Sequence, residues 1–270
     1  MNTKKTAITI LAILVIILGL FFTGLYIQTE KMFRESYSSE YSYQVTISAE
    51  RSLDNVTLIL PLPSWNGNSP IGEAILQEEG YGFPDDWKCS LVEIDGAVML
   101  QISADRIVPT YRNLITPTPI RPGETPPPTP EIITSTEYSE ATPVLIPIEF
   151  GVSLRDVEEI NTRDPLGNEP VLSPKRNLTL AEEPYDTPTP PGGVSVSSYY
   201  TFESPFSAAY ACDPETLVTI DISHQGGNSW WVLGWSGNSF RESVSITLIG
   251  PDPGWQYGTG SLRTGEGRYR

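Results

Sequence analysis

The chain has 270 residues, of which 33 are acidic and 17 are basic, so its formal net charge at pH 7 is −16. Nucleic acids and anionic lipid headgroups are bound by clustered Lys and Arg, and an acidic surface repels both. The composition therefore argues against a nucleic-acid partner. Two cysteines and one histidine are also too few for a Cys/His zinc site.

The chain opens with an apolar run at residues 7–27 that carries no charge and has only Thr9 and Thr23 as polar side chains. About 20 apolar residues in a helix cover the hydrocarbon core of a bilayer, whereas the core of a cleavable signal is about 7–15 residues long. The run predicts an uncleaved, single-pass transmembrane anchor. Lys4 and Lys5 precede it, which favours a cytoplasmic location for residues 1–6 and an extracytoplasmic one for the rest.

A polar spacer is predicted over residues 28–40, followed by one β-rich domain over residues 41–265. From Tyr41 to Ala49, apolar and polar side chains alternate, as expected of a strand with one buried face. The Asp95-Gly96 pair between two apolar runs predicts a tight β-hairpin, because its residues adopt the positive φ angles of a type I′ turn.

Two segments rich in proline and threonine, residues 116–137 and 184–193, are predicted to be disordered inserts. The stretch between them is too short to bury a core of its own, so we expect one interrupted domain rather than several. Within it, a long strand from Val144 to Leu154 contains Pro147. Proline cannot donate to a β-ladder, so this strand is expected at a sheet edge.

Two further features fit an extracytoplasmic domain. Cys89 and Cys212 could form one disulfide, which would persist only in an oxidising compartment. Asn55 and Asn177 each begin an Asn-X-Thr sequence that could accept an N-linked glycan.

The fold class follows from the number and spacing of these strands. We count about nine or ten short alternating strands, with only short helical signals such as Ile71 to Glu79. This pattern favours an all-β ectodomain, an antiparallel β-sandwich, over a parallel sheet whose crossovers would need helices.

The sole histidine lies near three of the six tryptophans. His224 shares its parity with the apolar row that ends at Ile222, and Gln225 to Asn228 is predicted to form a tight turn. In one interpretation, the tryptophans form a platform for sugar rings and polar side chains supply hydrogen bonds at its rim. In the other, the same residues fill the core, and their solvent exposure would discriminate between the two. The candidate ligand-binding set is His224, Gln225, Asn228, Trp230, Trp231 and Trp235.

The sequence offers little catalytic chemistry. It contains no HExxH, P-loop or dinucleotide-binding fingerprint, so no metal and no cofactor are predicted. Acidic pairs such as Asp85-Asp86 and Glu158-Glu159 would point to opposite faces of a strand, which is unsuited to a catalytic dyad. We therefore expect a non-catalytic protein.

Several stretches resemble a known group of sequences: VTLILPLPSWNGNSPIGEAIL, ISADRIVPTY, PIEFGVSLRDVEEINTRDPLGNEP and GWSGNS, set among Thr-Pro tracts behind one amino-terminal span. They are similar to uncharacterised membrane-anchored exported proteins of methanogenic archaea, over most of residues 41–265. The resemblance implies an archaeal cell surface. It implies no activity, because the group has none assigned.

Three functions remain open at this point. The first is a structural or interaction module of the cell envelope, held by its membrane helix and binding another envelope protein or a surface glycan. The second is a carbohydrate-binding domain that uses Trp230, Trp231 and Trp235 as a platform. The third is a pilin-like filament subunit, because an apolar helix before a β-rich head is the pilin layout.

Overall fold

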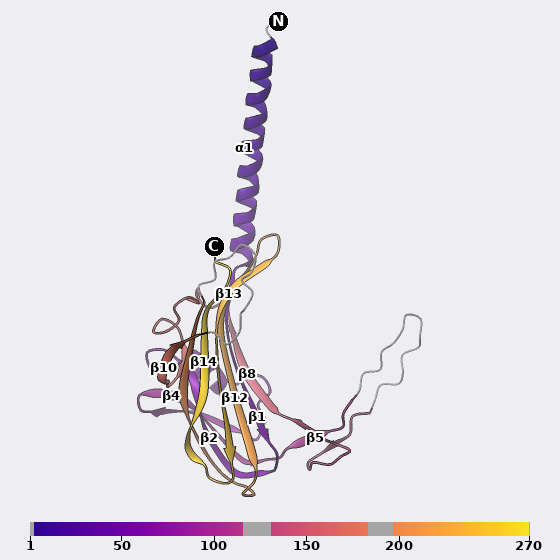
Figure 1. Cartoon of the computed structure of the whole chain (residues 1–270), viewed down its shortest axis with the longest axis vertical. Helices are drawn as coiled ribbons and strands as arrows, with labels where there is room; N and C mark the ends of the chain where they lie inside the picture. The colour runs from indigo at the N-terminus through magenta and orange to yellow at the C-terminus, as the bar shows by residue number, and fades with distance from the viewer. Residues whose placement is uncertain (1–2, 116–130, 183–196, 270) are drawn as a thin grey trace.

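The computed structural model describes residues 3–115, 131–182 and 197–269, with side chains described from residue 11 onward (Figure 1). Its first element is one helix, α1 (Thr3–Ser36), which stands away from an elongated β body. A segment of α1, Leu11–Ser36, contains an 18-residue window with a mean hydropathy of 2.3 and is long and apolar enough to cross a membrane. The predicted amino-terminal apolar helix is thus confirmed.

The polar spacer predicted over residues 28–40 is wrong as a separate segment. Residues 28–36 continue α1, and β1 (Ser38–Ala49) begins after a single intervening residue, Tyr37. Ion pairs one helical turn apart on α1, between Lys31 and Glu35 and between Arg34 and Glu30, accompany this extension.

The body is antiparallel throughout, which confirms the all-β prediction. Eleven strands form one curled sheet whose main path runs β3-β4-β2-β11-β14-β13-β12-β1-β8, with β10 paired to β11 and β9 paired to β2. The strands therefore belong to one continuous sheet rather than to two stacked sheets. The strands not yet given are β2 (Leu53–Ser64), β3 (Lys88–Ile94), β4 (Ala97–Ile107), β8 (Ile148–Arg155), β9 (Val171–Ser173), β10 (Arg176–Ala181), β11 (Ser198–Ala211), β12 (Leu217–Trp231), β13 (Trp235–Ile249) and β14 (Gly254–Gly267).

The core lies inside the curl. Along β1 every second residue is buried, and β12 and β13 alternate in the same way, so the apolar side chains of each strand face a shared interior. A short helix, α2 (Pro70–Leu76), contacts β2, β3 and β8. Tyr81 pairs with Gly151 of β8, so the segment before β3 reaches the opposite edge of the sheet and closes the curl on one side.

A small second sheet, β6-β5-β7, projects from the end of the body far from α1 (Figure 1). It contains β5 (Thr110–Arg112), β6 (Thr134–Ser135) and β7 (Val144–Ile146). The strand predicted from Val144 to Leu154 is divided at Pro147, and only its second half, β8, forms an edge of the main sheet.

The two predicted inserts have different outcomes. Residues 131–137 of the first insert are ordered and contribute β6, because Arg112 and Tyr111 pair with them; the predicted disorder is wrong there. Residues 116–130 and the whole second insert, 184–193, lie outside the described residues. The Asp95-Gly96 hairpin is confirmed, with positive φ angles of 52° and 78°.

Candidate functional site

The candidate residues lie on one long hairpin but on its two opposite faces. β12 and β13 pair without interruption from Leu217↔Ile249 to Trp231↔Trp235. The tight turn predicted at Gln225–Asn228 is therefore wrong. The chain reverses at residues 232–234 instead, where the Val232 N–H donates to the Gly234 carbonyl at 3.0 Å.

The glycines of this stretch have a packing role rather than a turn role. A Cβ atom on Gly226 would lie 2.4 Å from the ring of Phe240 and 2.9 Å from the ring of Tyr41. Gly226 thus lets two aromatic rings pack against the strand backbone, a requirement that sequence alone does not distinguish from a turn.

His224 is buried and contacts two backbone carbonyl groups. Its Nδ1 lies 2.9 Å from the carbonyl oxygen of Ser42, and its Nε2 lies 2.9 Å from that of Pro170. The ring stacks on Tyr41 at a centroid distance of 5.9 Å. Both of its nitrogens therefore contact groups inside the body, and its ring is not exposed to solvent.

A buried ion pair lies near this histidine. Glu242 of β13 is 2.6 Å from the Nζ of Lys175, and the other carboxylate oxygen accepts the Leu172 N–H at 2.6 Å. The side chains of Lys175 and Glu242 are 8% and 0% exposed, so this pair is screened from water. Lys175 also lies over the ring of Phe202, with Nζ 4.9 Å from the centroid.

Asn228 completes the interior network. Its Oδ1 accepts the Ile160 N–H at 3.0 Å and the Ser39 hydroxyl at 2.8 Å, while its Nδ2 donates to the Ile160 carbonyl at 2.8 Å and to Asn238 at 2.8 Å. The Asn228 side chain thus satisfies both the N–H and the carbonyl group of Ile160, as a neighbouring strand would. Ile160 itself lies outside any strand.

His224, Asn228 and Glu242 each have a partner in one segment, residues 156–175, which we call the cap segment. It contains Ile160, Pro170, Leu172 and Lys175, lies between β8 and β10 in the chain, and includes β9; its Ile160 and Leu172 are part of the core. The buried residues His224, Asn228 and Glu242 thus hold the cap segment in place. That role is structural.

The charges of this network follow from its burial. Burial lowers the pKa of His224 from its ordinary value, while the Glu242 carboxylate and the two carbonyl groups act in the opposite direction. Burial likewise lowers the pKa of Lys175 against the opposing effect of Glu242. A neutral imidazole at neutral pH is consistent with the lowered pKa of His224.

Trp230 is also buried, at the junction of α1 and the sheet. Its ring stacks on Tyr37 at 6.2 Å with an interplanar angle of 8°, and it meets Phe33 of α1 edge-on at 5.7 Å. The Ser36 hydroxyl accepts the Trp231 N–H at 2.8 Å. The last turn of α1 is therefore packed on the hairpin.

The other two tryptophans of the candidate set, Trp231 and Trp235, lie at the exposed tip of the hairpin. Trp231 is 39% exposed and Trp235 is 71% exposed, and their rings meet edge-on at 5.7 Å. The predicted sugar platform of three tryptophans with a rim of His224 and Asn228 is wrong, because Trp230, His224 and Asn228 are buried on the other face.

Gln225, the last member of the predicted set, lies on the outer face of the sheet. There it lines a groove of about 420 Å³ over β1, β11, β12, β13 and β14, which we call the outer groove. Arg241 and Arg263 of this groove both contact Glu266, at 3.7 and 3.2 Å. Besides these, it is lined by Ser42, Gln44, Tyr199, Ser223, Ser243 and Ser261, and by His224 and Glu242, whose side chains are buried.

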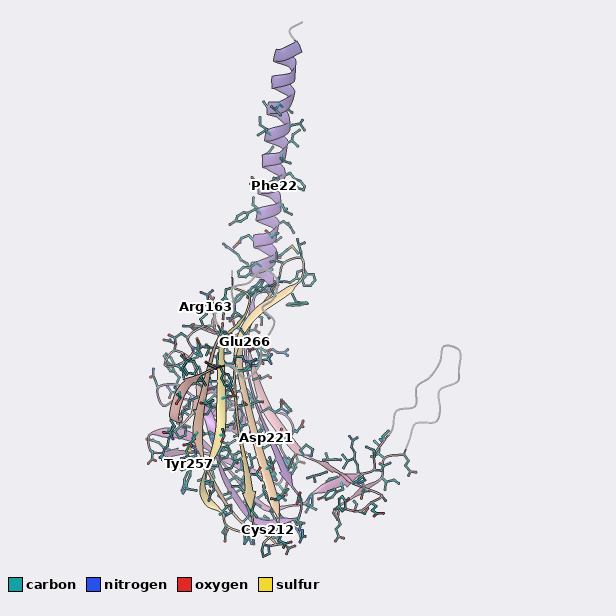
Figure 2. All side chains as sticks on the ribbon, in the orientation of Figure 1. Phe22, Arg163, Cys212, Asp221, Tyr257 and Glu266 are labelled. Atoms are coloured by element: carbon teal, nitrogen blue, oxygen red, sulfur yellow. The ribbon has the colours of Figure 1, made fainter. Side chains whose placement is uncertain are left out.

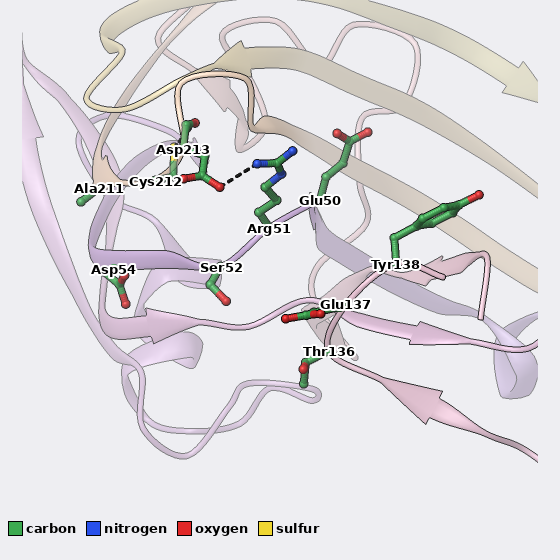
Figure 3. A pocket seen from close by; sticks show the side chains of 10 residues that line it. All are labelled: Glu50, Arg51, Ser52, Asp54, Thr136, Glu137, Tyr138, Ala211, Cys212 and Asp213. Atoms are coloured by element: carbon green, nitrogen blue, oxygen red, sulfur yellow. Dashed lines mark hydrogen bonds and ion pairs between the residues drawn. The ribbon is translucent and has the colours of Figure 1, made fainter. Parts of the chain in front are cut away.

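A cavity of about 600 Å³ lies at the end of the body far from α1, between the main sheet and the small second sheet (Figure 2, Figure 3). Its Arg51 forms an ion pair with Asp213 at 2.7 Å, and the carboxylates of Glu50, Asp54 and Glu137 point in separate directions around it. Within the described part of the chain, no group of three or more His, Cys, Asp or Glu side chains could hold a metal ion.

Cys89 and Cys212 are both free, so the predicted disulfide is wrong. Cys89 and Leu58 both pair with Ile102 of β4, so they lie at the same height along the sheet. Cys212 directly follows Ala211, which pairs with Asp54 of β2. Four residues of strand separate those levels, about 13 Å, and a disulfide requires Cα atoms within about 7 Å. Figure 2 shows Cys212 at the end of the body far from α1.

The two candidate glycosylation residues are exposed. Asn55 and Asn177 both adopt a φ of 53°, and the Asn177 side chain donates to Glu203 at 2.6 Å. Glycosylation at either asparagine stays a prediction.

Sequence reasoning missed Glu242 and Lys175. A signal for Glu242 exists, because it shares the parity of Val244, Ile246 and Leu248, and an acid in a core-facing row requires a buried partner. Nothing in the sequence pattern identifies Lys175 as that partner.

No protein-family model, no curated protein and no solved structure matches this chain.

Proposed function

We propose that this chain is a membrane-anchored, extracytoplasmic interaction module of the cell envelope, without catalytic activity of its own. In this proposal α1 crosses the membrane with Lys4 and Lys5 on the cytoplasmic side, and the β body stands outside. The sequence resemblance to exported proteins of methanogenic archaea is our reason for naming an archaeal envelope as its setting.

The observation that carries the proposal is the junction between α1 and the sheet. One residue separates the helix from β1, and Phe33, Tyr37 and Trp230 pack together across that connection. A body attached in this way has a defined orientation toward the membrane. Fixed presentation of one surface suits a protein that works by contact with a neighbour.

The outer face of the sheet is the surface that we propose for contact. Polar side chains lie in rows across its strands; one row comprises Gln44 and three serines, Ser223, Ser243 and Ser261. Ser243 and Ser261 lie 3.2 Å apart by their hydroxyls. Such a face offers many hydrogen-bonding groups at a low cost in side-chain entropy.

Site-specific photo-crosslinking in native membranes tests this assignment. A photoreactive residue in place of Ser243, at the centre of the outer face, is expected to give a discrete adduct. Ser90, an exposed serine on β3, is the matched control and is expected to give none. Equal labelling at the two positions contradicts the proposal, and so does protection of the body from protease added to intact cells.

The outer groove favours a surface glycan as a second candidate for the partner. Hydroxyl and amide groups, the ring of Tyr199 and two guanidinium groups within an otherwise acidic chain would suit an oligosaccharide that carries carboxylates. Titration of the full chain with neutral and uronic oligosaccharides tests this. Binding should weaken at least tenfold in Arg241→Ala and stay unchanged in Arg106→Ala, a control on β4; absence of binding removes the candidate.

The pilin-like alternative shares the helix-before-head layout but makes a different prediction about processing. The mass of the native amino terminus discriminates, because an unprocessed Met1 or Asn2 contradicts a pilin.

A further inference from the structure

The tip of the β12–β13 hairpin carries three large apolar side chains that are exposed to solvent. Leu233 is 77% exposed and Trp235 is 71% exposed, with Trp231 beside them. Leu233 adopts a φ of 56°, in the left-handed region that a leucine rarely occupies. A strained, solvent-facing leucine between two tryptophans calls for an apolar or interfacial partner.

The strand register shows where this tip lies. β12 runs antiparallel to β1 and pairs Ser229 with Ser38, the first residue of the strand that follows α1. The hairpin continues past Ser229 to Leu233, which extends it by at most about 13 Å beyond the start of β1. It therefore runs alongside the last turns of α1, as Figure 1 shows.

The apolar segment of α1 ends at nearly the same level. Ile27 lies nine residues before Ser36, the last residue of α1, which is about 13.5 Å along the helix. On α1, side chains 11–28 are exposed, and the first partly covered ones are Thr29 and Glu30. The hairpin tip thus reaches to within a few residues of the end of the apolar run.

From this placement we infer that Trp231, Leu233 and Trp235 lie in the headgroup layer of the membrane that α1 crosses, so that the body has a second contact with the lipid. The headgroup layer is about 5–8 Å thick on each side of the hydrocarbon core. In this placement the hairpin tip lies within that layer. Tryptophan is favoured in this layer because its ring is apolar and its N–H can hydrogen-bond with water or lipid. The inference rests on the proposed membrane anchoring by α1.

The test uses the full chain in phosphatidylcholine vesicles, with Cys89 and Cys212 replaced by alanine and serine. A nitrobenzoxadiazole fluorophore is attached to Leu233→Cys, and the vesicles contain lipid with a nitroxide near the headgroup. The matched control is Ile249→Cys, an apolar position that is 66% exposed and lies at the far end of β13, away from the hairpin tip. Circular dichroism confirms that both labelled proteins are folded.

We expect the nitroxide lipid to quench the probe at 233 at least twofold more than the probe at 249, with a blue-shifted emission at 233. Equal quenching at the two positions in protein that still floats with the vesicles after alkaline extraction overturns the inference and leaves the anchoring intact. Protein that does not float overturns both the anchoring and the inference.

Discussion

His224 shows how a residue that invites a functional interpretation can serve the fold. Both of its nitrogens face carbonyl oxygens, which only a doubly protonated ring would satisfy in full, yet burial disfavours the charge. The sequence pattern correctly places His224 in the core-facing row. Its partners could not be predicted, because Ser42 and Pro170 are brought to it by distant segments.

The single histidine makes this balance measurable. Because the pKa of His224 is lowered in the folded chain, the unfolded chain binds more protons just below the ordinary value of about 6.5. Stability should therefore fall as the pH falls from about 6.5 toward the folded pKa. The imidazole proton resonance of the full chain in micelles should titrate below 6.5, and a midpoint at or above that value contradicts the assignment.

The Lys175–Glu242 pair should show strong energetic coupling. Lys175→Met or Glu242→Leu alone leaves one buried charge unpaired, so each should lower the unfolding free energy by about 3–5 kcal/mol. The double substitution should cost less than the sum of the two, by about 1–3 kcal/mol. Urea unfolding of the four chains measures the cycle, and additive effects would show that the two side chains do not interact.

At the scale of elements, the hairpin shows where local pattern fails. Alternation predicts the faces of β1, β12 and β13, because period two is a local property of the backbone. The Gln225–Asn228 stretch has the composition of a turn but remains a strand, since Gly226 is required by rings from β1 and β13. Such close packing depends on residues that are distant in the sequence, so the local sequence pattern does not predict it.

Two neighbouring glycines test that explanation. Gly226→Ala forces a Cβ atom against the rings of Phe240 and Tyr41 and should destabilise the chain by about 1–3 kcal/mol. Gly227→Ala meets its nearest atom only at 3.2 Å and should change stability by less than about 0.5 kcal/mol. Thermal unfolding compares them, and equal effects would favour a turn at this position.

The cap segment depends on Asn228 in a similar way. Asn228→Ala removes the hydrogen bonds to both backbone groups of Ile160 and should cost about 2–3 kcal/mol. Gln225→Ala, on the outer face of the same strand, should cost less than about 0.5 kcal/mol. Hydrogen exchange should also accelerate across residues 156–175 in Asn228→Ala alone; unchanged exchange there would refute this role.

At the scale of the whole molecule, composition and periodicity predict an apolar helix before an antiparallel β body. They do not predict that the sheet is one continuous curl, because strand order is set by contacts between distant segments. The same limit explains the wrong disulfide: two cysteines in one domain permit a bond, and only the register shows that they are too far apart. The prediction of a separate spacer over residues 28–40 is wrong for the same reason. Its polar residues are compatible with a helix, and Phe33 of that helix packs against Trp230, which is distant in the sequence.

The central claim is that α1 and the sheet form one rigid unit projecting from the membrane. Double electron–electron resonance between spin labels at Lys31→Cys and Ser243→Cys, in the full chain without its native cysteines and reconstituted in vesicles, tests it most directly. One narrow distance distribution is the predicted result. A broad distribution, as a flexible spacer between helix and body would give, contradicts the account.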